Sequence, residues 1–237
     1  YGDHRDLHLS IRRQRQMCIR DRSNKELMAK LDLHKNTIGD FHRNLMDYYA
    51  QAGERHKRHS GEFVKYIGNF TVPEFNIDYL NVKDRTILRD RNWGSKAEWR
   101  DYMMSKGYNK VNTTLKMVEA EDLPSKLIVI LDKFDIKLPN FTMNIQPPGS
   151  VVPAHEDTWY KWCDRYPKEM EEYTFEDTKF YIWFLSDPEV GHSFQAGNTN
   201  VNWKKGDLIE MPYYCKHATS NAGFTNKILI QCLGIKK

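Results

Sequence analysis

Residues 138–237 alternate between apolar and polar positions with a period of two, which is the spacing of β-strands. Gly, Pro and Asn separate the alternating runs, as expected at turns between strands. The pattern predicts strands at Phe141–Gln146, Val151–Asp157, Lys179–Leu185, His192–Ala196, Thr199–Trp203, Leu208–Met211, Tyr214–Ser220 and Lys227–Leu233. We therefore expect residues 138–237 to form the β-rich core of the protein.

A long stretch at residues 158–177 interrupts this alternation. It contains Trp159, Trp162 and Pro167 among many glutamates. Loops of this length inside a compact domain are commonly functional. We expect an insertion at the mouth of a barrel, where it acts as a lid.

The chain before residue 138 shows helical periods. Apolar residues three or four positions apart predict an amphipathic helix over residues 24–51. Ser95–Glu98 is a capping box, in which the serine and glutamate side chains satisfy backbone N–H groups, and it predicts a helix to about Ser105. An apolar run predicts another helix over Ser125–Phe134.

Strand signals in the N-terminal part are weaker. Residues 61–92 predict loops with one or two strands, and residues 112–119 predict a strand. We therefore expect residues 23–137 to be a mostly helical region that packs on the β core. The predicted fold class is mainly β with flanking helices (α+β).

The composition and net charge of the chain bear on which kinds of partner it can bind. The chain has 237 residues, of which 40% are hydrophobic, so it can bury a core. Its net charge is +4, but residues 1–22 hold six Arg and three Asp and resemble a translated sequencing adapter. We predict that residues 1–22 are an irregular artefact and that the near-neutral remainder does not bind nucleic acid.

Two further expectations concern location. No apolar run reaches the ~18 residues needed to cross a bilayer, so no membrane association is expected. The chain has four cysteines, one of them Cys18 in the suspect segment. The other three do not make a disulfide framework, which favours a reducing cytoplasm.

The candidate chemistry lies at the end of the stretch 146–157, which closes with His155-Glu156-Asp157. Alternation along a strand places His155 and Asp157 on one face. A third candidate, His217, lies in a later predicted strand. Two imidazoles and one carboxylate can occupy one face of an octahedral iron(II) ion and leave other positions open.

Lys227 follows His217 by ten residues and opens the apolar final strand. A cation buried at such a position is costly unless an anion accompanies it. The pattern His155-x-Asp157, His217 and Lys227, within residues 138–235, resembles the iron(II)- and 2-oxoglutarate-dependent oxygenases. The prolyl and aspartyl/asparaginyl hydroxylase branches are the most similar.

The resemblance implies a double-stranded β-helix, a jelly-roll barrel related to the cupins. It implies that His155, Asp157 and His217 hold Fe(II), that Lys227 binds the 5-carboxylate of 2-oxoglutarate, and that O2 is the third reactant. Such enzymes couple the oxidative decarboxylation of 2-oxoglutarate to succinate with hydroxylation of a C–H bond. The implied substrates are Pro, Asp or Asn, either free or in peptides.

Other positions carry weaker signals. Asn144 is a candidate hydrogen-bond donor to 2-oxoglutarate, although it is equally well an ordinary polar strand residue. Tyr181 and Trp183 are candidate pocket residues, although aromatic residues on strands more often pack in a core. We interpret Cys215 as a buried thiol and His192 as a strand histidine without a ligand role.

Two alternatives remain open. A cupin-type metal-binding module or isomerase would share the barrel without 2-oxoglutarate, would typically use more His ligands and a Glu, and would not require Lys227. A structural barrel with a vestigial site is a third reading, against which the intact set of ligands argues. The substrate is expected to be a small molecule or a peptide, and the acidic, aromatic insertion suits a peptide or a cation. The oligomeric state is left open.

Overall fold

The computed structural model describes residues 64–88, 97–155, 157, 162, 165–167, 169, 172–173, 177–212 and 215–236. The chain divides into two compact units, residues 1–55 with 88–110 and residues 56–87 with 111–237. The predicted artefact 1–22, the helix over 24–51 and most of the insertion 158–177 lie outside the described residues. In the first unit, α4 (Ala97–Ser105) confirms the helix that was predicted to end near Ser105.

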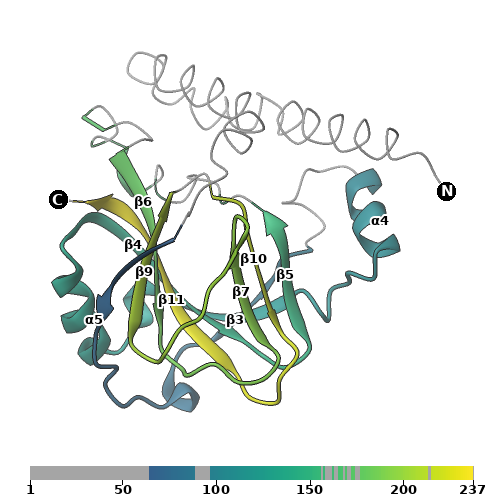
Figure 1. Cartoon of the computed structure of the whole chain (residues 1–237), viewed down its shortest axis with the longest axis horizontal. Helices are drawn as coiled ribbons and strands as arrows, with labels where there is room; N and C mark the ends of the chain where they lie inside the picture. The colour runs from purple at the N-terminus through teal and green to yellow at the C-terminus, as the bar shows by residue number, and fades with distance from the viewer. Residues whose placement is uncertain are drawn as a thin grey trace. The chain divides into compact units, whose positions relative to one another are not determined.

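The second unit contains two antiparallel sheets (Figure 1). The larger sheet has the strand order β1-β9-β6-β11-β4-β3-β2. Its strands are β1 (Lys65–Asn69), β2 (Lys83–Thr86), β3 (Thr114–Glu119), β4 (Ile136–Gln146), β6 (Thr178–Phe184), β9 (Asp207–Pro212) and β11 (Lys227–Lys236). The smaller sheet has the order β5-β10-β7-β8, with β5 (Ser150–His155), β7 (His192–Ala196), β8 (Thr199–Asn200) and β10 (His217–Asn221).

From β4 onward the chain passes back and forth between the two sheets. β4, β6, β9 and β11 lie in the larger sheet, whereas β5, β7, β8 and β10 lie in the smaller one. Every strand pair is antiparallel. This winding is a double-stranded β-helix, so the predicted fold class is confirmed.

The expectation for residues 23–137 needs correction where the structure describes them. Strands β1, β2 and β3 belong to the same sheet as β11, and the boundary placed at residue 138 falls inside β4. The one or two strands expected within residues 61–92 are β1 and β2, and the strand expected over residues 112–119 is β3. Short 3₁₀ helices lie at Ile77–Tyr79, Ala120–Asp122 and Asp132–Phe134.

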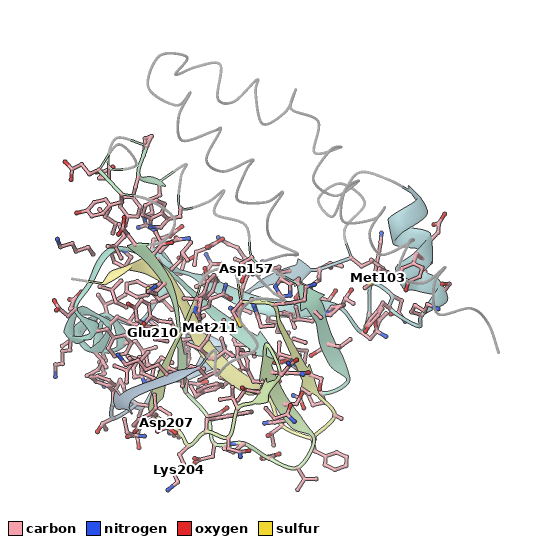
Figure 2. All side chains as sticks on the ribbon, turned by 45° about the horizontal axis from the view of Figure 1, so that its top comes forward. Met103, Asp157, Lys204, Asp207, Glu210 and Met211 are labelled. Atoms are coloured by element: carbon pink, nitrogen blue, oxygen red, sulfur yellow. The ribbon has the colours of Figure 1, made fainter. Side chains whose placement is uncertain are left out.

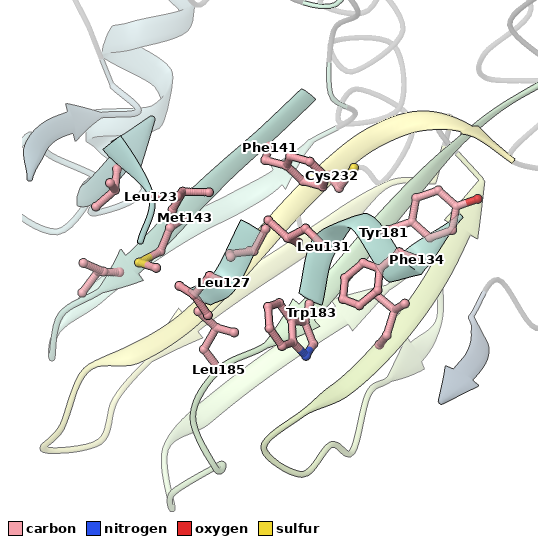
Figure 3. Packing of buried hydrophobic residues seen from close by; sticks show 14 residues of the cluster. Leu123, Leu127, Leu131, Phe134, Phe141, Met143, Tyr181, Trp183, Leu185 and Cys232 are labelled. Atoms are coloured by element: carbon pink, nitrogen blue, oxygen red, sulfur yellow. The ribbon is translucent and has the colours of Figure 1, made fainter. Parts of the chain in front are cut away.

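Helix α5 (Ser125–Leu131) covers the outer face of the larger sheet, as its apolar run predicted (Figure 3). Leu127 and Leu131 pack there against Met143, Trp183 and Ile230, and all five side chains are essentially inaccessible to solvent. Burying each such side chain contributes about 1.5–3 kcal/mol. Among the described residues, no helix combines the length and the apolarity that crossing a membrane requires.

The opposite face of the larger sheet looks toward the smaller sheet. Because side chains alternate, the positions between the core residues point into the barrel. These inward positions include Asn144 on β4, Ile182 on β6, and Lys227 and Gln231 on β11. Figure 2 shows Asp157 at one end of the barrel, and Lys204, which precedes β9, and Asp207, the first residue of β9, at the other.

Candidate metal centre

Three side chains that could hold a metal meet where two neighbouring strands of the smaller sheet end and begin. His155 is the last residue of β5, and His217 is the first residue of β10. The two are direct partners in the antiparallel pairing of these strands. Asp157 follows β5 by two residues. One ligand atom from each residue lies within 4.8 Å of the others, so the structure brings together the triad that the sequence predicted.

The two imidazoles both face the carboxylate. His155 Nε2 lies 3.5 Å from Asp157 Oδ1, and His217 Nε2 lies 3.3 Å from Asp157 Oδ2. The ring centroids are 4.4 Å apart. This geometry leaves room for a small cation that contacts one atom of each side chain.

Backbone hydrogen bonds fix the protonation of both rings. The Nδ1 atom of His155 lies 2.9 Å from the carbonyl oxygen of Pro153, and Nδ1 of His217 lies 3.0 Å from that of Cys215. Because a carbonyl oxygen only accepts, both Nδ1 atoms donate, and in a neutral ring Nε2 then carries a lone pair. Two lone pairs facing a carboxylate require a cation between them, either a proton or a metal ion.

The electrostatics of Asp157 agree with that requirement. Burial alone would raise the pKa of Asp157, but hydrogen bonds and charge from His155, and then from His217, outweigh burial and hold this pKa well below its usual range. The carboxylate is therefore ionised at neutral pH. Two imidazoles and one carboxylate suit a divalent first-row metal such as Fe(II).

A chain of two amides holds the carboxylate in place. Gln231 Nε2 donates to Asp157 Oδ2 at 3.0 Å, and Asn144 Nδ2 donates to Gln231 Oε1 at 3.3 Å. Since a carboxylate only accepts, Gln231 must present its nitrogen to Asp157, which in turn orients Asn144. Asn144 Oδ1 is left buried without a partner among the described residues. Asn144 therefore belongs to this chain of amides, and its donation to 2-oxoglutarate stays a prediction.

Lys227 is fully buried in the same cavity. Its Nζ donates to the carbonyl oxygens of Ser193 (2.6 Å) and Ser220 (3.0 Å) and to Thr219 Oγ1. Burial lowers the pKa of Lys227 to about 7. No carboxylate among the described residues forms an ion pair with it. The site thus contains a buried amine for which the described residues supply no counter-charge.

The cavity lies between the two sheets. The residues that line it are Arg85, Ile87, Leu115, Asn144, Gln146, Val152, His155, Asp157, Ile182, Phe194, His217, Thr219, Lys227, Leu229 and Gln231. Sequence reasoning missed Arg85 and Gln231. Arg85 lies on the short edge strand β2, and only the pairing of β2 with β3 brings it to the cavity.

Tyr181 and Trp183 do not line the cavity, and this expectation is corrected. Both belong to the core that packs against α5, where Trp183 Nε1 donates to the carbonyl oxygen of Gly206 at 3.1 Å. Ile182, between them in sequence, is the residue that faces the cavity. β6 carries aromatic residues on both of its faces, so its sequence could not indicate which face points into the cavity.

The other candidates lie as follows. Cys215 is buried, as expected. His192 bonds to its own turn, accepting from the N–H of Glu189 and contacting the carbonyl oxygen of Thr225, and it is not part of the triad. In the insertion, Trp162 is buried and its Nε1 donates to the carbonyl oxygen of Leu138 at 2.8 Å. A lid role for the insertion stays a prediction.

The chain matches no protein-family profile and no curated protein. Among solved structures it is similar to a predicted oxalate decarboxylase from Thermotoga maritima, with 16% identity, 52% of this chain and 81% of that chain covered, and a TM-score of 0.32. It is also similar to a cupin-superfamily sugar phosphate isomerase from Silicibacter pomeroyi, with 7% identity, 68% and 75% covered, and a TM-score of 0.36. A cupin 2 conserved barrel domain protein from Salinispora arenicola shows 9% identity, 52% and 76% covered, and a TM-score of 0.32. The fold is therefore assigned from the strand order rather than from these similarities.

Proposed function

We propose that the chain is an Fe(II)- and 2-oxoglutarate-dependent dioxygenase that hydroxylates a C–H bond. One observation carries the proposal: the triad His155, Asp157 and His217 shares a cavity with Lys227, a buried amine that pairs with no carboxylate in the described part of the chain. The triad could hold a metal ion and leave other coordination positions open. The buried lysine could bind an anionic group of a cosubstrate, which would offset the cost of burying its charge.

In this proposal each residue has a defined task. His155, Asp157 and His217 hold the iron, which when bound supplies the activation of O2. Gln231 fixes the orientation of the Asp157 carboxylate. Lys227 pairs with the 5-carboxylate of 2-oxoglutarate, which takes the place of one of its present acceptors. The attraction between the ammonium and the carboxylate offsets the free-energy cost of removing the ammonium from water.

The substrate class follows from the resemblance alone. We retain Pro, Asp or Asn, free or in a peptide, as the substrates to test first.

A second candidate is a cupin-type metal-dependent module or isomerase that uses no 2-oxoglutarate. One observation favours it: three protein oxygens already accept the three hydrogens of the Lys227 ammonium. In that case Lys227 would stabilise the smaller sheet and bind no ligand.

The two candidates differ in succinate formation. The full chain would be purified without oxygen, loaded with Fe(II), and assayed in air for succinate from 2-oxoglutarate without added substrate. We expect slow turnover that His217→Ala abolishes and that His192→Ala, a histidine outside the triad, leaves unchanged. Lys227→Met should raise the 2-oxoglutarate concentration required and leave metal affinity unchanged. If the protein binds metal but shows neither succinate nor metal-dependent 2-oxoglutarate binding, the dioxygenase is excluded and the cupin-type module is favoured.

A further inference from the structure

The cavity contains a second cation that the proposed function does not use. Arg85 of β2 is half-buried and lines the cavity together with the triad and Lys227. No described residue accepts a hydrogen bond from its guanidinium or forms an ion pair with it. Asp157 is the one acidic residue that lines the described part of the cavity, and the metal would use its charge.

The two cations lie at the same level of the larger sheet but on different strands. The register of β2 with β3 pairs Arg85 with Leu115, and that of β4 with β11 pairs Gln146 with Lys227. The register of β3 with β4, continued by one residue beyond Lys116 and Ile145, completes a row of three inter-strand steps, so the Cα atoms of Arg85 and Lys227 are roughly 14 Å apart. The Nζ atom of Lys227 is held by the smaller sheet, whereas Arg85 has no acceptor among the described residues, so we assign a separate anionic group to each cation.

The cosubstrate supplies one of these groups. If 2-oxoglutarate bound the metal through its 1-carboxylate and keto oxygen, its 5-carboxylate would be the one charged end left. We assign that carboxylate to the fully buried Lys227, which leaves Arg85 for a different anion. A divalent metal, Asp157, Lys227, Arg85 and the cosubstrate dianion together leave a single positive charge. One singly charged anion on the substrate would neutralise it.

We propose that Arg85 binds a carboxylate of the substrate and so selects acidic substrates for the proposed dioxygenase. This inference rests on the proposed function. A guanidinium presents two parallel N–H donors that match the planar carboxylate. The apolar side chains of Ile87, Leu115 and Val152 line the same cavity and would exclude water from this pair.

The proposed substrate charge is opposite to the cationic substrate that the acidic insertion suggested. Most of that insertion lies outside the described residues, whereas Arg85 lies in the cavity itself. An acidic substrate of this kind is a free amino acid or the C-terminus of a peptide, each of which presents an α-carboxylate.

The test compares molecules that differ in one charge. The probes are N-acetyl-L-proline, N-acetyl-L-aspartate and N-acetyl-L-asparagine, the three free amino acids, and the corresponding amides of the α-carboxylate. The proteins are the wild type, Arg85→Gln, and Lys83→Gln as a control, because Lys83 is an exposed cation on the same strand. Succinate formation above the substrate-free rate and saturation-transfer NMR would measure stimulation and binding.

We expect at least one acid to bind and to stimulate succinate formation, and its amide to do so roughly tenfold to a hundredfold less well. Arg85→Gln should remove this preference while 2-oxoglutarate affinity stays within about twofold. Lys83→Gln should behave as the wild type does.

Three results would overturn the inference: amides as effective as acids, no acid bound by the wild type, or a large loss of 2-oxoglutarate affinity in Arg85→Gln. The last result would assign Arg85 to the cosubstrate. Failure of the proposed function is seen separately, as absent turnover before any substrate is added. The NMR comparison of acid with amide does not depend on turnover.

Discussion

The affinity for 2-oxoglutarate should fall as the pH rises above neutrality, because Lys227 must be protonated to pair with the 5-carboxylate. Burial lowers the pKa of Lys227 to about 7. The amine is therefore half protonated at pH 7 in the free protein, and a bound carboxylate draws a proton onto it. Binding above pH 7 takes up one proton and weakens accordingly.

The magnitude follows from the protonated fraction. With a pKa of about 7, the fraction falls from one half at pH 7 to about one hundredth at pH 9, so the dissociation constant should rise about 50-fold. Over this range Asp157 stays ionised, because its pKa is held well below its usual range. In Lys227→Arg the guanidinium stays protonated, and the affinity should not change with pH.

The same shift predicts how stability depends on pH. The pKa of Lys227 is lowered from 10.5 to about 7 on folding, so between these values the unfolded chain binds more protons than the folded one. The destabilisation from burying the charge is fully present below pH 7 and is lost as the pH rises toward 10.5. Relative to Lys227→Met, the wild type should therefore gain stability over this window, by up to roughly 4 kcal/mol.

Isothermal titration of 2-oxoglutarate into Mn(II)-loaded protein at pH 7, 8 and 9 would measure the affinity. Wild type, Lys227→Arg and Lys227→Met would be compared with Lys126→Arg, an exposed lysine on α5. Lys227→Met serves in case the larger arginine prevents folding, and it should bind weakly at every pH. A wild-type affinity that does not vary with pH, or an equal slope in Lys227→Met, would refute the reasoning.

Three further predictions concern the metal, the core and a turn. Gln231→Leu removes the hydrogen bond to the metal-facing carboxylate and should weaken Co(II) affinity about 10–100-fold in a competition titration, and an unchanged affinity would exclude this role. Leu127→Ala should lower the free energy of unfolding, measured in urea, by about 2–5 kcal/mol. Val129 is exposed, so Val129→Ala should lower it by less than about 0.5 kcal/mol. Equal losses in the two variants would contradict the burial of Leu127 of α5. Gly191→Ala should destabilise more than Gly149→Ala, because both have positive φ but a Cβ at 191 would lie 2.5 Å from backbone atoms, and a smaller loss at 191 would contradict the packing there.

The strands of the barrel could be predicted because alternation is a local property of the sequence. Each strand from β4 to β11 was anticipated, with the largest difference at the start of β4, which begins at Ile136 and not at Phe141, and smaller differences at β8, β10 and β11. The triad could be predicted for a similar reason: two of its members are neighbours in sequence, and the third lies on a recognisable strand.

The parts of the site that the sequence did not predict depend on contacts between residues far apart in the chain. Arg85 reaches the cavity only because β2 pairs with β3, and Gln231 braces Asp157 across 74 positions of the chain. The assignment of Tyr181 and Trp183 failed because aromatic residues occupy both faces of β6. In that strand the hydrophobic pattern identifies a buried strand but not its inward side.

The final strand has a consequence for how this protein can evolve. On β11, Lys227, Leu229 and Gln231 line the cavity, while Ile230 and Cys232 belong to the core beneath α5. Inserting or deleting one residue would exchange the two faces, placing a lysine and a glutamine in the core and isoleucine in the cavity. Lineages can therefore diversify this cavity by substituting alternate residues, or by changing the loops, but not by shifting the strand.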